Sequence, residues 1–210
     1  MSNLANPQSG LRERSPADAV PDSMIKAVAA MREGKDTWLE VSVRQDPLNG
    51  HRFTVAVEIG APADEVYALL DWADERNKWR QMGDSVTALD AEGQRFRLVI
   101  SFMQDICFDF QVEEAIKPQV YVSTCVPTPP VGHLERSFEE YRIEPIDDAR
   151  CAVTYTMTAH FEAGLNKRQA AEVMRTMTVA CHNSLAKLKA DAEHGVGTFE
   201  AFCAARLMPL

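Results

Sequence analysis

The chain has 210 residues, 46% of them hydrophobic, which is enough for one domain with a sizeable core. Its 22 basic and 31 acidic side chains give a formal net charge of -9, so nucleic acid and anionic lipid surfaces are excluded as expected partners. Five widely spaced cysteines without a CxxC pair indicate a reduced compartment. No apolar stretch has the length of a signal-peptide core or a membrane span, so a soluble cytoplasmic protein without stable membrane insertion is expected.

The first fifty residues are predicted to precede a domain that starts at residue 51. Residues 1–21 are rich in Asn, Ser, Pro and charged side chains, a composition typical of a flexible tail. Residues 22–50 are predicted to form an amphipathic helix and then an extra strand at about residues 37–45. The apolar face of that helix is expected to consist of Met24, Ile25, Val28 and Met31. The sequence Asp-Pro-Leu-Asn-Gly then favours a hairpin turn into the next strand.

A strand and a helix follow each other directly in the stretch FTVAVEIGAPADEVYALLDWADERNKWR, residues 53–80. The strand alternates with a period of two, and its buried face is predicted to consist of Phe53, Val55, Val57 and Ile59. Pro62 suits the first helical position, and the acidic residues that follow it complement the positive end of the helix dipole. The helical pattern runs to Trp79 with a break near residues 71–74, which predicts two short helices.

Six further strands are indicated by alternating apolar residues, at about residues 85–90, 94–102, 106–115, 121–126, 134–144 and 152–161. The short gaps between them favour antiparallel neighbours. One long helix from about residue 167 to 193 ends the regular pattern. Asn166 is its expected N-cap, Gln169 the capping-box partner and Gly195 the stop. Residues 196–210 are predicted to be a docking tail.

The order of these elements resembles the helix-grip fold of the START, polyketide-cyclase and birch-pollen-allergen-like proteins, the SRPBCC superfamily. The motif IGAPADEVYALL at residues 59–70, and Trp79 before the second strand, carry the resemblance, which covers about residues 52–193. It implies an α+β domain at residues 51–195, in which a curved seven-stranded antiparallel sheet wraps around the long C-terminal helix and two short helices follow the first strand. In this fold the space between sheet and helix is a cavity for apolar molecules.

The inward faces of the strands and one face of the long helix are almost wholly apolar. The resemblance implies that they line a ligand cavity, with these expected contacts: Trp79, Leu98, Ile100, Phe108, Phe110, Tyr141, Tyr155, Met157, Met174, Met177 and Cys181. Ligand sites in general are concave and mainly apolar. The same pattern is also typical of a solidly packed core, and the residues alone leave both interpretations open.

A few polar residues are candidates for chemistry within that space. One strand directs Glu139 and Tyr141 inward, and together with Tyr155 they are weak candidates for acid or base catalysis, because burial raises the pKa of a carboxyl group. A glutamate at the open rim, paired with an arginine, is the alternative interpretation. Arg76 and Arg80 either meet an anionic ligand head or lie in solvent.

No cofactor and no metal are expected. The sequence lacks GxSxG, HExxH and P-loop patterns, and its histidines have no companions at ligand spacing. The leading hypothesis is non-catalytic binding or transport of a hydrophobic small molecule, such as a lipid-like, polyketide or isoprenoid compound. A polyketide cyclase or dehydratase is the first alternative, and a protein-interaction module resembling co-chaperones of Hsp90 is the second. The additions at both ends are compatible with a homodimer.

Overall fold

The computed structural model describes residues 40–45, 50–77, 85–100 and 103–198. The predicted N-terminal tail and amphipathic helix, Trp79 and Arg80, and most of the predicted docking tail lie outside these residues. Within them, the chain forms one antiparallel sheet, a short helix after its second strand and a long helix after its last strand. None of the described helices is both long and apolar enough to cross a membrane.

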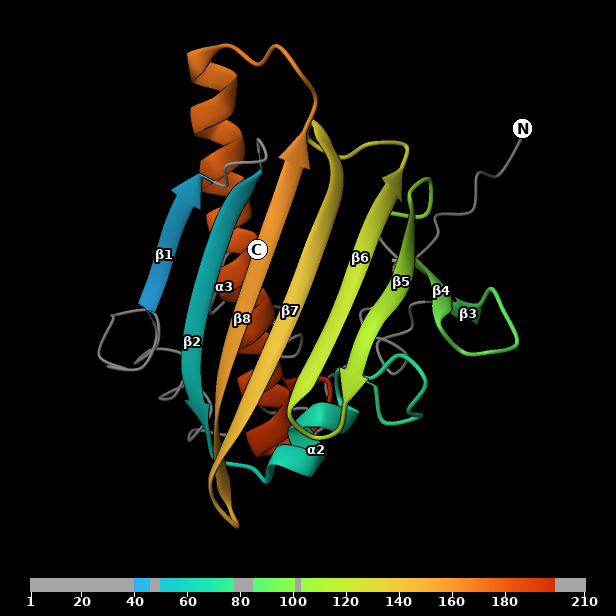
Figure 1. Cartoon of the computed structure of the whole chain (residues 1–210), viewed down its shortest axis with the longest axis vertical. Coiled ribbons are helices and arrows are strands. Elements are labelled where there is room, and N and C mark those ends of the chain that lie inside the picture. Colours follow the sequence, from blue (N-terminus) through green and yellow to red (C-terminus); the bar gives the residue numbers. More distant parts are fainter. Residues whose placement is uncertain (1–39, 46–49, 78–84, 101–102, 199–210) are drawn as a thin grey trace, which may run out of the picture.

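The sheet has eight strands in the order β1-β2-β8-β7-β6-β5-β4-β3, and every neighbouring pair is antiparallel (Figure 1). The curved seven-stranded sheet expected from the resemblance is confirmed, and β1 extends it at one edge by pairing with β2. The strands are β1 (Glu40–Gln45), β2 (His51–Ile59), β3 (Ser85–Ala88), β4 (Arg95–Val99), β5 (Cys107–Ile116), β6 (Val120–Thr128), β7 (Leu134–Asp147) and β8 (Arg150–Phe161).

The long helix α3 (Lys167–His194) begins and ends where its capping residues predict. The side chain of Asn166 accepts hydrogen bonds from the backbone N–H groups of Arg168 and Gln169, and the Gln169 side chain completes the capping box. Gly195 ends the helix with φ of +99°, a conformation that residues with a Cβ rarely adopt. These local signals position α3 along one face of the sheet.

The short helix α2 (Ala63–Ala68) differs from the prediction in two ways. The sequence predicts Pro62 at the first helical position, but in the structure Pro62 is the N-cap and the helix begins one residue later, at Ala63. The second short helix is absent from residues 69–77, which form turns instead. The side chains of Asp71 and Asp74 accept the backbone N–H groups of Ala73 and Arg76, each at 2.9 Å. These side-chain bonds to the backbone take the place of helical hydrogen bonds, so residues 71–76 form turns and not a second helix.

Asn77→Ala is expected to lower the free energy of unfolding by about 1–3 kcal/mol, because it removes a buried donor from this turn. Asn77 is fully buried, and its Nδ2 donates to the carbonyl oxygens of Leu70 and Asp71 at 3.0 and 3.1 Å. Urea unfolding followed by circular dichroism measures the change. Ala73→Ser, at an exposed position of the same turn, is the control. Equal stability of the two variants would contradict the expectation.

The hydrophobic core is closed on one side of the molecule and open on the other. The helix α3 packs chiefly on β2, and in Figure 1 it lies behind β2 and β8, while β3 and β4 stand clear of it. Inward residues of the farther strands, such as Ile100, Phe108 and Tyr141, are only half-buried. A single helix therefore covers only part of this wide sheet. The fully buried side chains between α3 and the sheet include Phe53, Val55, Ile59, Cys151, Val153, Cys181, Leu185 and Leu188.

Candidate functional site

A cavity of about 270 Å³ occupies the part of the inner sheet face that α3 leaves uncovered. Its walls come from β4 to β8, from the turn after α2, and from one edge of α3. Most of the surface is apolar, and aromatic rings are frequent. The lining consists of Leu70, Trp72, Leu98, Ile100, Phe108, Phe110, Tyr121, Ser123, Cys125, Leu134, Ser137, Glu139, Tyr141, Tyr155, Met157, Ala180 and Ser184.

Trp72 fixes the turn after α2 against one end of the cavity. Its ring lies 4.5 Å from that of Phe110 and 6.5 Å from that of Phe96, measured between centroids. Its backbone N–H donates to the hydroxyl oxygen of Tyr121 at 3.1 Å. Aromatic contacts at these separations stabilise a defined arrangement, so the indole is a rigid part of the wall.

A polar group stands on the opposite wall, where β7 and β8 pair. The Ser137 hydroxyl donates to Oε1 of Glu139 at 3.0 Å. The rings of Tyr141 and Tyr155 are stacked with their centroids 4.4 Å apart, and these two residues occupy opposite positions on the paired strands. Among the described lining residues, Glu139 is the only carboxylate. The strand alternation that directs Ile143 into the core also directs this set inward.

The charge of Glu139 acts on several neighbouring groups. Burial raises the pKa of Tyr141 and of Tyr155 well above the usual value, and the carboxylate of Glu139 raises both further. Burial also raises the pKa of Cys125 and Cys181, and the Glu139 carboxylate raises the pKa of both thiols further. Both phenols are therefore neutral at physiological pH. They share a hydrogen bond with each other, which leaves one phenol O–H as a donor to a ligand. This wall can bind a donor group through Glu139 and an acceptor group through a phenol.

The structure brings together most of the residues predicted to contact a ligand. Seven of them line the cavity, namely Leu98, Ile100, Phe108, Phe110, Tyr141, Tyr155 and Met157. Cys181 lies behind the wall, with its Sγ 3.9 Å from Sδ of Met157. Met174 and Met177 pack against the core beside the cavity, and Trp79 is outside the described residues. The three weak candidates for acid or base catalysis, Glu139, Tyr141 and Tyr155, all line the cavity.

The helix presents small residues to the cavity where the sequence suggested large ones. Ala180 and Ser184 form the helical part of the lining, one position before the fully buried Cys181 and Leu185. Sequence reasoning also missed Trp72 and the inward residues of β6. The alternation of Tyr121, Ser123 and Cys125 was the available signal for β6, and nothing local indicated Trp72.

Arg76 and the histidines do not contribute to this cavity. The Arg76 guanidinium bonds to Oδ2 of Asp74 at 2.8 Å, outside the lining. His133 contacts Glu162 through its Nδ1 at 3.0 Å, and burial lowers the pKa of His182. Across the described ranges, no three His, Cys, Asp or Glu side chains gather as metal ligands.

Buried thiols should react slowly with iodoacetamide in the folded protein. A thiol whose pKa is raised is protonated at pH 8, and only the thiolate attacks. Burial raises the pKa of Cys181 to about 12 and that of Cys151 to about 11. Partly exposed Cys107 is the internal control. Mass spectrometry of alkylated peptides, with and without urea, gives the rates, and equal rates for Cys181 and Cys107 in the folded state would contradict this expectation.

A family model described as polyketide cyclase / dehydrase and lipid transport matches residues 50–193. Among solved structures, a START superfamily protein from Mycobacterium smegmatis is 13% identical, with 65% of this chain and 94% of that chain covered and a TM-score of 0.47. The protein Ara h 8.0201 is 11% identical, with 65% and 95% covered and a TM-score of 0.49. A conserved protein of unknown function from Enterococcus faecalis is 10% identical, with 89% and 98% covered and a TM-score of 0.51.

At these identities the likeness to solved structures concerns the fold alone. No curated protein matches the chain. The family model covers more than half of the sequence, from the residue before β2 to the last turn of α3, and therefore includes every strand except β1. The chain therefore belongs to the polyketide cyclase / dehydrase and lipid transport family, within the SRPBCC superfamily.

Proposed function

We propose that this protein binds a compact, mainly apolar small molecule in the cavity between the sheet and α3, without transforming it. The observation that carries the proposal is the lining, which is apolar and aromatic with one hydrogen-bonded polar wall. Ligand sites have this composition, because apolar surface supplies affinity and a few placed polar groups supply orientation. The name of the family, which includes lipid transport, supports the same assignment.

The size of the cavity narrows the class of ligand. Its volume of about 270 Å³ is slightly below the roughly 300–1,000 Å³ typical of sites for drug-sized molecules. One or two fused rings, or a short chain, match that space, whereas a sterol or a long-chain lipid exceeds it. The position of Glu139 favours a molecule with a single hydroxyl or amine donor.

Binding of 2-naphthol, 1-decanol and cholesterol tests this proposal. We expect 2-naphthol to bind with saturation and to change the tryptophan fluorescence, because the Trp72 indole lines the cavity. The signal should be lost in Trp72→Phe, while native mass spectrometry still detects the complex. Cholesterol should not bind. A protein that takes up none of the three compounds, by either method, would refute the carrier function.

A cyclase or dehydratase is the second candidate, because the cavity contains one carboxylate beside a hydroxyl group. If the protein is an enzyme, Glu139→Gln should reduce turnover of a short poly-β-keto thioester by about 100-fold or more. Binding of 2-naphthol should change far less. Glu144→Gln, at an exposed position of the same strand, is the matched control. Wild-type protein without turnover, or a Glu139→Gln variant as active as wild type, eliminates this candidate.

The interaction-module alternative and the homodimer depend on the two ends of the chain. These ends lie mostly outside the described residues, so both stay predictions, as do the domain bounds at residues 51 and 195. The same holds for cytoplasmic localisation.

A further inference from the structure

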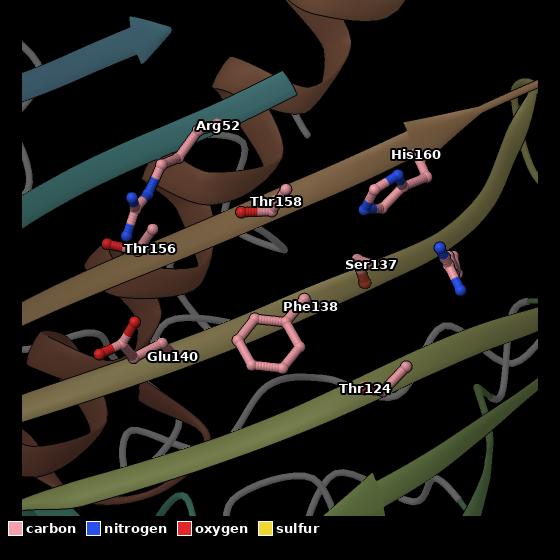
Figure 2. Close-up of a pocket in the computed structure, with 9 residues that line it drawn as sticks. Arg52, Thr124, Ser137, Phe138, Glu140, Thr156, Thr158 and His160 are labelled. Atoms are coloured by element: carbon pink, nitrogen blue, oxygen red, sulfur yellow. The ribbon is translucent and has the colours of Figure 1, made fainter. Parts of the chain in front are cut away.

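A second concave site lies on the outer face of the sheet, which faces away from α3. Outward-facing residues of β2, β8, β7 and β6 surround a groove of about 370 Å³ there, and they alternate along each strand with the residues that face α3. Figure 2 shows Arg52, Thr158, His160 and Phe138 on the same side of the ribbon, with the helix behind it. The groove and the apolar cavity are therefore separated by the sheet itself.

The register of the strands brings positive charge to both sides of β8. Arg52 on β2 is opposite Thr158, and Arg136 on β7 is opposite His160. Their strands are roughly 10 Å apart, since each lies one strand spacing from β8. The two arginines are also offset by two residues, roughly 7 Å, along the strands. Both exposed side chains are long enough to reach one group above Thr158. The His160 ring lies at the Arg136 end of the groove, beyond Thr158 from Arg52 (Figure 2), and supplies a further nitrogen there.

These two arginines lack a carboxylate partner, in a chain whose net charge is -9. Over the described residues, no ion pair involves either of them, although four other arginines have such pairs, namely Arg76, Arg97, Arg142 and Arg150. Both side chains are exposed. The one carboxylate in the groove, Glu140, pairs with Arg142. The excess charge of the groove is therefore positive.

The rest of the groove is suited to the uncharged part of a ligand. Phe138 on β7 is opposite Thr158 on β8. Its side chain is 40% exposed, which is unusual for a large apolar residue. The hydroxyls of Thr124, Thr156 and Thr158 lie around it. A flat ring can pack on the phenyl group while hydroxyls bond to its substituents.

We propose that this groove binds a small phosphate monoester with an aromatic or other apolar body. The phosphate lies between Arg52 and Arg136, and the body lies on Phe138. A guanidinium group binds phosphate oxygens through two parallel N–H donors, and two such groups match the near-dianionic charge of a monoester at pH 7. The site does not depend on the apolar cavity or on its proposed ligand.

Phenyl phosphate, inorganic phosphate, benzoate and phenol test the proposal, in NMR titrations of the ¹⁵N-labelled full chain at low ionic strength. Phenyl phosphate should shift the amide signals of Arg52, Phe138 and Thr158 with saturation. Inorganic phosphate should bind more weakly at the same amides, benzoate more weakly than phenyl phosphate because it carries one charge, and phenol not at all. Benzoate binding as tightly as phenyl phosphate would overturn the assignment of a phosphate ligand.

Substitutions on the outer face distinguish specific binding in the groove from nonspecific electrostatic attraction of an anion. Arg52→Gln and Arg136→Gln should each weaken phenyl phosphate binding about tenfold, and Phe138→Ser should weaken it without affecting inorganic phosphate. Arg95→Gln, an exposed arginine on β4 without an ion pair among the described residues, should have no effect. Equal losses in Arg95→Gln and Arg52→Gln would overturn the proposal. Thermal unfolding confirms that each variant is folded.

The cavity variant Ala180→Phe distinguishes the two sites. If phenyl phosphate binds on the outer face, its affinity is unchanged in this variant, whatever happens to 2-naphthol. If the variant loses phenyl phosphate binding, the compound enters the cavity and the outer site is refuted. Failure of 2-naphthol to bind wild-type protein refutes only the cavity function.

Discussion

Ala180→Phe is expected to abolish binding of 2-naphthol while the protein remains folded. Ala180 lies on the edge of α3 that faces the cavity, and its methyl group is part of the lining. A phenyl ring at this position would enter the space of about 270 Å³ that a ligand requires. The ligand would then have to displace a packed ring, so affinity should fall at least about tenfold. Isothermal titration calorimetry measures this change.

The neighbouring residue supplies the control for this prediction. Val179 is 51% exposed and lies about 100° around the helix from Ala180, outside the cavity lining, so Val179→Phe adds a ring of the same kind without entering the cavity. Its affinity for 2-naphthol should equal that of wild type. Overpacking can destabilise a core by about 1–3 kcal/mol, and Ser184→Phe is the second filling variant if Ala180→Phe unfolds. Undiminished binding in both filled variants would exclude the cavity as the ligand site.

Leu185→Ala is expected to lower the free energy of unfolding by about 2–5 kcal/mol, the range for truncating a fully buried leucine. Leu185 is 0% exposed, one turn of α3 from Cys181 and in the part of the core that α3 closes. Phe108→Ala removes a larger side chain, but Phe108 is half-buried and already borders the cavity. Its cost should therefore be smaller, about 1–2 kcal/mol.

The two truncations should also differ in their effect on binding. Phe108→Ala enlarges the cavity, so it should raise the affinity for the four-ring compound 1-hydroxypyrene relative to that for 2-naphthol. Leu185→Ala should leave the ligand range unchanged. Chemical denaturation gives the two stabilities, and fluorescence titration gives the affinities. A larger loss of stability in Phe108→Ala than in Leu185→Ala would show that the cavity is filled by packed side chains in solution.

The proposed binding function depends on a mismatch between the width of the sheet and the width of one helix. Eight strands form a surface that α3 covers chiefly over β2 and its two neighbours, β1 and β8. Elsewhere the inner face is completed by the turn around Trp72, whose ring contacts Phe110 at 4.5 Å. The space that remains is lined mainly by apolar surface, and burying such surface against a matching molecule that replaces water is favourable.

Local sequence signals determined the elements of this fold. A period of two in β2 indicates which side chains are buried, and the structure buries Phe53, Val55, Val57 and Ile59 as predicted. The capping box at Asn166 and the glycine at position 195 specify the bounds of α3 within one residue. Each of these features depends on residues a few positions apart, so the amino-acid sequence is sufficient to identify them.

Tertiary structure alone decided which apolar residues line a cavity and which pack solidly. Met157 faces the cavity, whereas Cys181, whose sulphur lies 3.9 Å away, belongs to the closed core behind it. Ala180 and Cys181 are adjacent on α3 and point about 100° apart. The lateral position of α3 over β2 directs Cys181 to the closed core and Ala180 to the cavity. That position results from contacts between segments that are far apart in the chain. A periodic pattern indicates which face of an element is buried. It does not indicate whether another element packs closely against that face or leaves a cavity there.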